Sequence, residues 1–136
     1  MSKAGKAIAT LFAPARKASE NAYSPYSGVK VGASLLDEDG NVYSGCNVEN
    51  ASYGLTQCAE RNALVTAING GMKPGTAHTM LIVATGFEVV APCGACRQVM
   101  SELMTEDAVI ITCHTETDYQ SWTIGELLPD SFVLKK

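Results

Sequence analysis

Two separate segments of the chain carry residue types that could form a metal centre. In the first, Cys58 stands two residues before Glu60. In the second, Cys93 and Cys96 follow Pro92 at a spacing of about one helical turn. Zinc takes thiolates readily, and three protein ligands leave its fourth tetrahedral position open for a water molecule. The pattern therefore predicts a zinc centre in which Cys58, Cys93 and Cys96 are the ligands.

Glu60 has a role of its own in this prediction. Bound zinc lowers the pKa of a water molecule towards neutrality, which makes hydroxide available for hydrolysis. A carboxylate that is not a ligand is then needed to carry protons by general acid–base catalysis. Because Glu60 lies two residues from Cys58, we expect it to be the catalytic residue.

The charge of such a centre also has to be balanced. Three thiolates on Zn²⁺ leave a net charge of about −1, which works against acidification of the bound water. Arg61 and Arg97 each directly follow one part of the pattern and could supply positive charge. If both cysteine segments begin helices, the helix N-termini add partial positive charge.

A non-catalytic interpretation of the same cysteines is also open. A Cys-x-x-Cys pair by itself is typical of redox proteins and of one half of a structural zinc site. A structural site needs a fourth ligand, and the sequence offers these candidates: Cys46, Cys113, His78 and His114. A zinc-stabilised binding module is therefore the alternative to an enzyme, and the position of Glu60 favours the enzyme.

Length, charge and cysteine content restrict the class of protein. At 136 residues, of which 46% are hydrophobic, the chain is long enough for one globular domain over residues 1–136. The net charge of −4 and the lack of a basic block argue against a nucleic-acid partner. No apolar run is long enough to span a membrane, and no signal peptide is recognisable. Five cysteines, an odd number, are typical of a reducing compartment, so we expect a cytoplasmic protein.

The hydrophobic pattern predicts alternating helices and strands. Apolar residues recur at helical spacing in the segments 3–22, 57–69 and 94–104. Pro14 interrupts the first segment, which either kinks there or divides in two. Strands are expected at 29–35, 42–46, 80–84 and 109–112, with a short one around 121–122. This order indicates an α/β fold with a central sheet and helices on both faces.

Polar residues stand directly after the strand predicted at 42–46. They are Asn47, Glu49 and Asn50. Polar side chains in loops at strand ends often carry function. Asparagine also caps turns, and both interpretations stay open at this point.

Over nearly its whole length, the chain resembles the short, homotetrameric type of cytidine deaminase. The resemblance is carried by the segments 22–27, 31–33, 45–51, 58–61, 92–98 and 126–129. The Asn47-x-Glu49-Asn50 block together with the zinc pattern is specific to this group. The resemblance implies a three-layer α/β/α sandwich around a central mixed five-stranded sheet.

The resemblance also implies an activity, which is zinc-dependent hydrolysis of cytidine and 2′-deoxycytidine to uridine and 2′-deoxyuridine plus ammonia, in pyrimidine salvage. One Zn²⁺ per subunit would be held by the three cysteines. Glu60 would pass a proton from water to N3 of the pyrimidine and would protonate the leaving ammonia.

Further residues receive roles from the same resemblance. Asn47 and Glu49 would hold the ribose 3′-hydroxyl, and the backbone around Ala59 and Ala91 would contact the base. Arg61 would hydrogen-bond a ligand thiolate. In a homotetramer with active sites at subunit interfaces, two aromatic side chains would reach a neighbouring site: Tyr53 and Phe132.

One residue departs from the family pattern. Family members usually carry an aromatic residue at the position of Val29, where the ring packs on the base. Loss of an aromatic stack costs about 1 kcal/mol in binding. We therefore expect Val29 to weaken cytidine binding or to admit a bulkier, modified cytosine.

Two rival activities share the zinc pattern. One is deamination of a cytosine-bearing antibiotic such as blasticidin S, against which Glu49 beside Asn47 indicates a ribose site. The other is nucleic-acid editing, which chain length, negative charge and the lack of a basic or aromatic groove disfavour. A neutral small-molecule nucleoside is therefore the expected partner.

Overall fold

The structure of the protein, a computed structural model, describes residues 2–85 and 91–135. Within these residues, helices and strands alternate along the chain much as the hydrophobic pattern predicts. The elements are α1 (Lys3–Ser19), β1 (Lys30–Leu36), β2 (Val42–Cys46), the 3₁₀ turn η1 (Tyr53–Leu55), α2 (Ala59–Asn69), β3 (Ala77–Thr85), α3 (Gly94–Leu103), β4 (Met104–Cys113), β5 (Tyr119–Thr123) and α4 (Ile124–Leu127).

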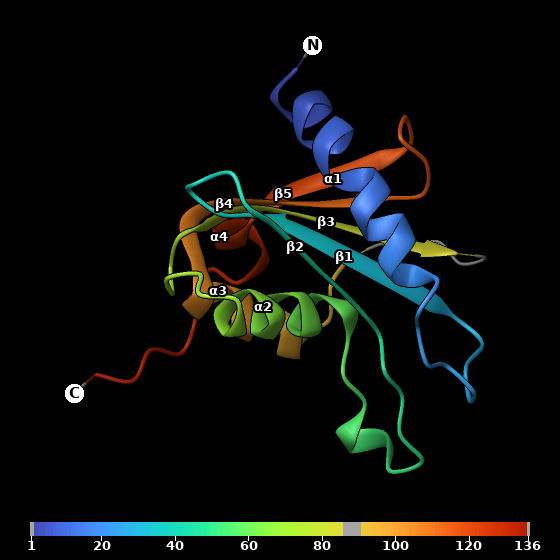
Figure 1. Cartoon of the computed structure of the whole chain (residues 1–136). Helices are drawn as coiled ribbons and strands as arrows, with labels where there is room; N and C mark the ends of the chain where they lie inside the picture. The colour runs from blue at the N-terminus through green and yellow to red at the C-terminus, as the bar shows by residue number, and fades with distance from the viewer. Residues whose placement is uncertain (1, 86–90, 136) are drawn as a thin grey trace.

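The strands form one mixed sheet in the order β2-β1-β3-β4-β5. β3 and β4 are parallel, and the three other pairings are antiparallel. α1 lies on one face of this sheet, and α2, α3 and α4 lie on the other (Figure 1). The prediction of a three-layer α/β/α sandwich with a mixed five-stranded sheet is confirmed.

β3 shows why the helices cover both faces. Its side chains alternate between the two hydrophobic clusters of the protein, because successive residues of a strand point to opposite sides. Met80 and Ile82 pack in the cluster that contains α2 and α3. Leu81 and Val83 pack in the cluster that contains α1. All four are at most 1% exposed, so β3 is buried on both faces, as its continuous apolar run predicts.

α1 runs from Lys3 to Ser19 as one helix with Pro14 inside it. The interpretation in which Pro14 divides the segment into two elements is therefore wrong. The buried residues Ile8, Leu11 and Ala15 hold the helix against the sheet on both sides of the proline. This packing offsets the backbone hydrogen bond that a proline cannot donate.

Two glycines let helices approach the sheet closely. A side chain on Gly32 of β1 would collide with the backbone of α1 at Ala15 and Ser19. A side chain on Gly45 of β2 would collide with the backbone of α2 at Ala63. α2, whose first turn follows Cys58, is thereby fixed close to β2.

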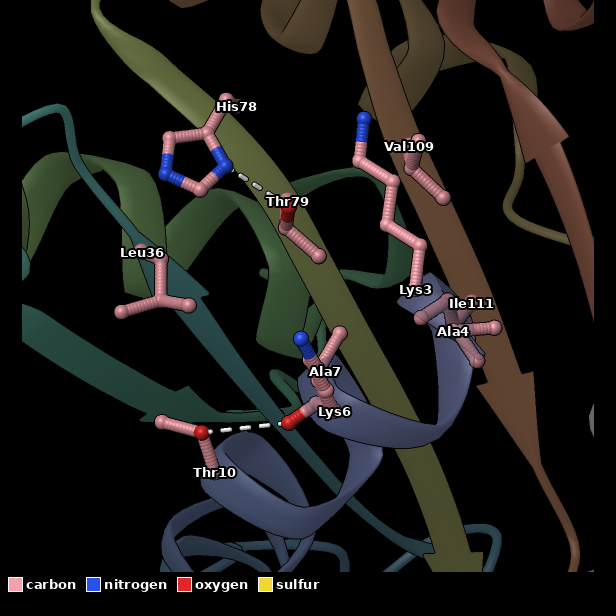
Figure 2. A pocket seen from close by; sticks show the side chains of 10 residues that line it. All are labelled: Lys3, Ala4, Lys6, Ala7, Thr10, Leu36, His78, Thr79, Val109 and Ile111. Carbon is pink, nitrogen blue, oxygen red and sulfur yellow. Dashed lines mark hydrogen bonds between the residues drawn. The ribbon is translucent and has the colours of Figure 1, made fainter. Parts of the chain in front are cut away.

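A hollow of about 400 Å³ lies between the first turns of α1 and the sheet (Figure 2). Its lining combines apolar side chains from α1, β1, β3 and β4 with Lys3, Lys6 and His78. None of the residues predicted to act in catalysis or substrate binding lines this hollow, so the candidate site has to lie elsewhere. In the described part of the chain, no helix combines the length and the apolar character that crossing a membrane requires.

Candidate active site

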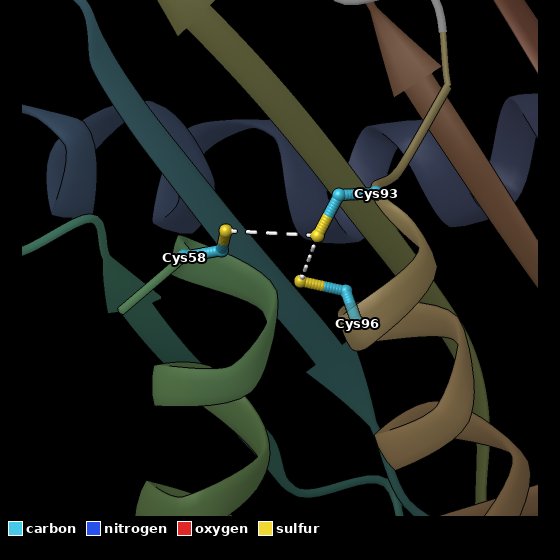
Figure 3. A group of neighbouring side chains, drawn as sticks. All are labelled: Cys58, Cys93 and Cys96. Atoms are coloured by element: carbon cyan, nitrogen blue, oxygen red, sulfur yellow. Dashed lines mark hydrogen bonds between the residues drawn. The ribbon is translucent and has the colours of Figure 1, made fainter. Parts of the chain in front are cut away.

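The three predicted zinc ligands meet at the N-terminal ends of α2 and α3. The sulfur atoms of Cys58 and Cys93 lie 3.8 Å apart, and those of Cys93 and Cys96 lie 3.3 Å apart. All three sulfur atoms lie within 4.8 Å of one another. Figure 3 shows the side chains pointing towards one another from the starts of the two helices.

Helix capping explains why two of the three thiols are directed away from their own helices. Cys58 is the N-cap residue of α2, and Cys93 is the N-cap residue of α3. Their carbonyl groups accept the first helical hydrogen bonds, from the backbone N–H groups of Asn62 and Arg97. Neither thiol caps its own helix, so both are free to bind a metal ion. The positive ends of both helices lie beside the sulfur atoms and favour thiolates.

The donor set and its spacing fit zinc. Tetrahedral coordination with Zn–S distances of about 2.3 Å separates sulfur atoms by about 3.8 Å, close to the separations observed. Among the described residues, no fourth histidine, cysteine or carboxylate joins the group. His78 lies at the hollow beside α1, and Cys113 packs in the cluster on the α1 face of the sheet. The arrangement therefore matches a three-ligand catalytic centre better than a closed structural one.

Arg61 lies beside the cluster. Its Nη2 donates to the Cys58 sulfur at 3.5 Å and to the Thr56 carbonyl at 3.3 Å. Hydrogen bonding from the Cys96 thiol, and then from Arg61, lowers the pKa of Cys58 to about 5. The hydrogen bond to Cys58 and burial raise the pKa of Cys96. The donors around Cys58 therefore favour its thiolate form, which is the form in which a cysteine binds a metal ion.

Glu60 lies in the first turn of α2 and is 6% exposed. Burial raises the pKa of its carboxyl group, and the negative charge of Cys58 raises it further. Buried carboxylates of raised pKa cluster at sites of proton transfer. Glu60 has the environment that a proton carrier near neutral pH requires.

A cavity of about 310 Å³ opens over the cluster. Two of the sulfur-bearing residues, Cys58 and Cys93, line it together with Glu60. Other predicted site residues line the same cavity, namely Val29, Asn47, Ala59 and Ala91. Residues that come before and after β3 in the sequence thus line the same cavity.

Asn47 directly follows β2 and is buried, and its side chain stabilises the start of β1 as well as lining the cavity. Its Oδ1 accepts from the Val31 N–H at 2.8 Å, and its Nδ2 donates to the Val29 carbonyl at 2.9 Å. Asn47 therefore has the turn-fixing role that its residue type favours. An amide group has two donors and two acceptor positions, so one of each is left for another partner.

Glu49 lines another hollow, of about 400 Å³, which adjoins the cavity over the sulfur cluster. Its carboxylate accepts from the backbone N–H groups of Tyr26 and Ser27, at 2.9 Å and 3.1 Å, and from the Ser27 hydroxyl. Hydrogen bonding from the Ser27 side chain lowers the pKa of Glu49. This Glu49 hollow and the cavity over the sulfur cluster share Ser27 and Thr56. The Glu49 carboxylate therefore borders the space above the sulfur cluster.

The two aromatic residues predicted to reach a neighbouring subunit lie apart from each other. Tyr53 is 76% exposed, lines the Glu49 hollow and meets the ring of Tyr26 edge-on, with centroids 6.0 Å apart. Phe132 is 70% exposed and lies in a different hollow, beside Ser101 and Glu102. Phe132 does not line the cavity over the sulfur cluster, and its reach into a neighbouring subunit stays a prediction.

Sequence reasoning missed two lining residues and misjudged the role of a third residue, Arg97. Ser27 and Thr56 line both the cavity and the Glu49 hollow, and nothing in the sequence distinguishes them from other hydroxyl residues in turns. Arg97 was expected to balance the charge of the sulfur atoms. Instead, its Nε and Nη1 donate to the carbonyl groups of Pro92 and Leu127.

Residues 6–112 match a family model described as the cytidine and deoxycytidylate deaminase zinc-binding region. A cytidine deaminase of Halalkalibacterium halodurans is 48% identical over 122 residues, which cover 90% of this chain and 91% of the relative. The chain belongs to the cytidine deaminase family. A second member, from Sporosarcina psychrophila, is 42% identical over 125 residues, covering 92% of this chain and 90% of its own.

Solved structures of the family share the fold. The crystal structure of cytidine deaminase from Burkholderia pseudomallei matches with a TM-score of 0.83 and 44% identity, covering 97% of this chain and 100% of that one. The Mycobacterium tuberculosis cytidine deaminase matches with a TM-score of 0.78 and 38% identity, covering 93% and 97%. Membership of the cytidine deaminase family and the prediction of an enzyme are thereby confirmed.

Proposed function

We propose that the protein hydrolyses cytidine and 2′-deoxycytidine to uridine and 2′-deoxyuridine, releasing ammonia. One observation carries this proposal: a single cavity is lined by Cys58, Cys93, Glu60 and Asn47, with the Cys96 sulfur beside it. Metal ligands, a buried acid and a polar group for the sugar therefore face the same space. We also propose that residues 1–136 act as one domain, supported by the one sheet that joins both cysteine segments.

Cys58, Cys93 and Cys96 would hold one Zn²⁺ per subunit, which would supply an acidified water molecule. Glu60 takes a proton from the attacking water and delivers it to N3 of the pyrimidine. It then takes the second proton of that water, now on the C4 hydroxyl group, and delivers it to the amino group, which leaves as ammonia. Its burial supports this role, because a raised pKa brings the carboxyl group towards the working pH. Arg61 stays protonated and donates to the Cys58 sulfur, which offsets part of the thiolate charge.

Asn47 and Glu49 bind the ribose in this proposal. Ser27 and Tyr26 use three acceptor positions of the Glu49 carboxylate, and a carboxylate offers about four. The position left can accept from the 3′-hydroxyl, while the free N–H of Asn47 donates to it. The backbone at Ala59 and Ala91, which line the cavity, contacts the base.

The lining of the cavity over the sulfur cluster and of the adjoining Glu49 hollow favours a nucleoside over a nucleotide. Among the described residues that line them, none is a lysine or an arginine, and Glu49 is an acid. A phosphate group would find no lysine or arginine to pair with, and it would lie near a carboxylate. We expect zinc-loaded protein to deaminate cytidine and 2′-deoxycytidine with a kcat/KM at least about 100-fold above that for cytidine 5′-phosphate, since like-charge contacts cost several kcal/mol.

Loss of the ultraviolet cytosine band measures this preference directly. Blasticidin S belongs in the same panel of substrates. Comparable rates for the nucleoside and its 5′-phosphate would contradict the proposed substrate class. Turnover of blasticidin S alone would replace the nucleoside by an antibiotic, and no turnover by protein of confirmed zinc content would leave the non-catalytic binding module.

Val29 provides a second test of the substrate site. It lines the cavity, and its carbonyl is fixed by Asn47. Val29→Phe should lower the KM for cytidine about fivefold, because an aromatic contact with the base is worth about 1 kcal/mol. Steady-state kinetics measure this, with Val42→Phe on the exposed edge of β2 as the matched control. An unchanged KM in Val29→Phe would show that Val29 does not contact the base.

We further propose a homotetramer that works in pyrimidine salvage in the cytoplasm. Several large apolar side chains are exposed near the candidate site, on α2 and in the C-terminal segment; they are Tyr53, Leu55, Val65, Ile68, Phe132, Val133 and Leu134. Exposed apolar patches mark protein interfaces. Subunit contacts would bring Tyr53 and Phe132 to a neighbouring site. None of the five cysteines forms a disulfide bond, which supports a reducing compartment.

A further inference from the structure

Arg97 connects two segments that are far apart in the sequence. Its Nε donates to the Pro92 carbonyl at 2.8 Å, and its Nη1 donates to the Leu127 carbonyl at 2.9 Å. Hydrogen bonds from a charged donor are roughly twice as strong as neutral ones. The planar guanidinium group presents its donors in a fixed geometry, so one side chain can hold two carbonyl groups at a set separation.

The first of these carbonyl groups belongs to the residue before a predicted zinc ligand. Pro92 precedes Cys93, and Cys93 is the most exposed of the three cysteines. The Cys93 carbonyl accepts from the backbone N–H of Arg97 at 3.1 Å. Arg97 therefore holds the turn at Cys93 on both sides, with its backbone bonded to the Cys93 carbonyl and its side chain bonded to the preceding one, that of Pro92.

The second carbonyl group belongs to a well-anchored element. Leu127 is the last residue of α4, and its side chain is buried with Ile124 in the cluster that also contains Cys96. The start of α4 is closed by a capping box between Thr123 and Glu126. α4 is therefore a firm support at the far end of the Arg97 bridge.

We propose that Arg97 is a positioning residue that fastens the Cys93 turn to α4 and thereby keeps the Cys93 sulfur in place for the metal. Its role differs from that of Arg61, which donates to a sulfur atom directly. The C-terminal segment thus takes part in holding the metal, although it supplies no ligand among the described residues. The inference rests on the proposed zinc centre and is independent of the substrate.

Gln98 is the natural control for this role. It is the next residue of α3 and also bonds the C-terminal segment, because its Nε2 donates to the Phe132 carbonyl at 3.1 Å. Among the described residues, its side chain makes no hydrogen bond to the Pro92 turn. Gln98→Ala therefore removes a tie between α3 and the C-terminal segment but leaves the turn untouched.

The test compares zinc release from the holoenzyme in Arg97→Met, Arg97→Lys and Gln98→Ala. Transfer of zinc to a colorimetric chelator should be about 10- to 100-fold faster in Arg97→Met, as for other groups that support metal ligands from outside. Methionine keeps the apolar packing of the arginine stem. Gln98→Ala should stay within about twofold of the parent. The cobalt-substituted protein should show altered thiolate-to-cobalt absorption in Arg97→Met alone.

Arg97→Lys tests whether the geometry of the two hydrogen bonds or the positive charge alone holds the Cys93 turn. It also replaces Arg97→Met in the test if that variant does not fold. A lysine keeps the charge but is a point donor without the fork that spans two carbonyl groups, so rapid zinc release is expected here too. Parent-like release from Arg97→Lys, or equal acceleration in Gln98→Ala, would overturn the inference. Parent protein that binds no zinc would overturn both proposals, whereas zinc-loaded parent that leaves cytidine intact would overturn the proposed function alone.

Discussion

Replacement of Glu60 by glutamine should lower kcat for cytidine by about 10²- to 10⁴-fold, the usual contribution of a positioned proton carrier. Glutamine has nearly the same shape and keeps a polar group in the cavity, but it cannot accept and return a proton at neutral pH. The KM for cytidine should change much less than kcat. Because Glu60 is not one of the three clustered thiols, zinc content should stay at the parent level.

The measurement needs rate and metal content from the same preparations. Loss of cytosine absorbance gives the rate, and a chelator titration of denatured protein gives the zinc. Glu106→Gln, which changes an exposed acid on β4, is the matched control and should be fully active. A Glu60→Gln protein with full zinc and parent-like kcat would remove Glu60 from the mechanism.

Replacement of Cys96 by alanine should abolish activity through loss of the metal. Structural zinc sites bind with about 10–16 kcal/mol shared among four ligands, so one thiolate is worth about 2.5–4 kcal/mol. Zinc affinity should therefore fall by about 10²- to 10³-fold. Cys96 is fully buried, and its sulfur lies 3.3 Å from that of Cys93, so no external group easily replaces it.

Competition with a chelator of known affinity measures the loss. Cys113→Ala is the matched control, because Cys113 is equally buried but lies on the α1 face of the sheet. It should lose some stability through poorer packing while keeping its zinc. If Cys96→Ala bound zinc as tightly as Cys113→Ala does, the ligand assignment would be wrong.

Much of the fold could be predicted because hydrophobic periodicity differs between its layers. The run 80–84 is apolar on both faces and became the centre of β3, while the alternation after residue 29 became β1. β4 was underestimated. It begins at Met104, well before the apolar run at 109–112, because Met104 pairs with Ala77 of the neighbouring strand. Pairing across a sheet leaves no signal in the sequence of the strand alone.

The candidate site also has a part that could be predicted from the sequence and a part that could not. Cys58, Glu60, Cys93 and Cys96 could be picked out because metal chemistry restricts both residue type and spacing. The partnership of Ser27 with Glu49 could not, since those residues are 22 positions apart. It depends on backbone pairing at Val48, which bridges to two other segments of the chain.

Arg97 shows a further reason why contacts escape prediction. Its place directly after Cys96 indicates a role in balancing charge, yet its guanidinium is directed to a carbonyl group 30 residues later in the chain. Only the position of α4, which depends on the packing of Ile124 and Leu127, decides between these partners.

The distribution of the three cysteines along the chain bears on the order of folding. Cys93 and Cys96 are neighbours as soon as the first turn of α3 forms, whereas Cys58 is 35 residues from Cys93. Between them lies β3, which has to be inserted between β1 and β4 before the two helix ends can meet. We therefore expect the three thiols to come together late in folding, so that high-affinity metal binding follows the completion of the sheet. Bound metal would then stabilise the folded chain, because global unfolding has to release it.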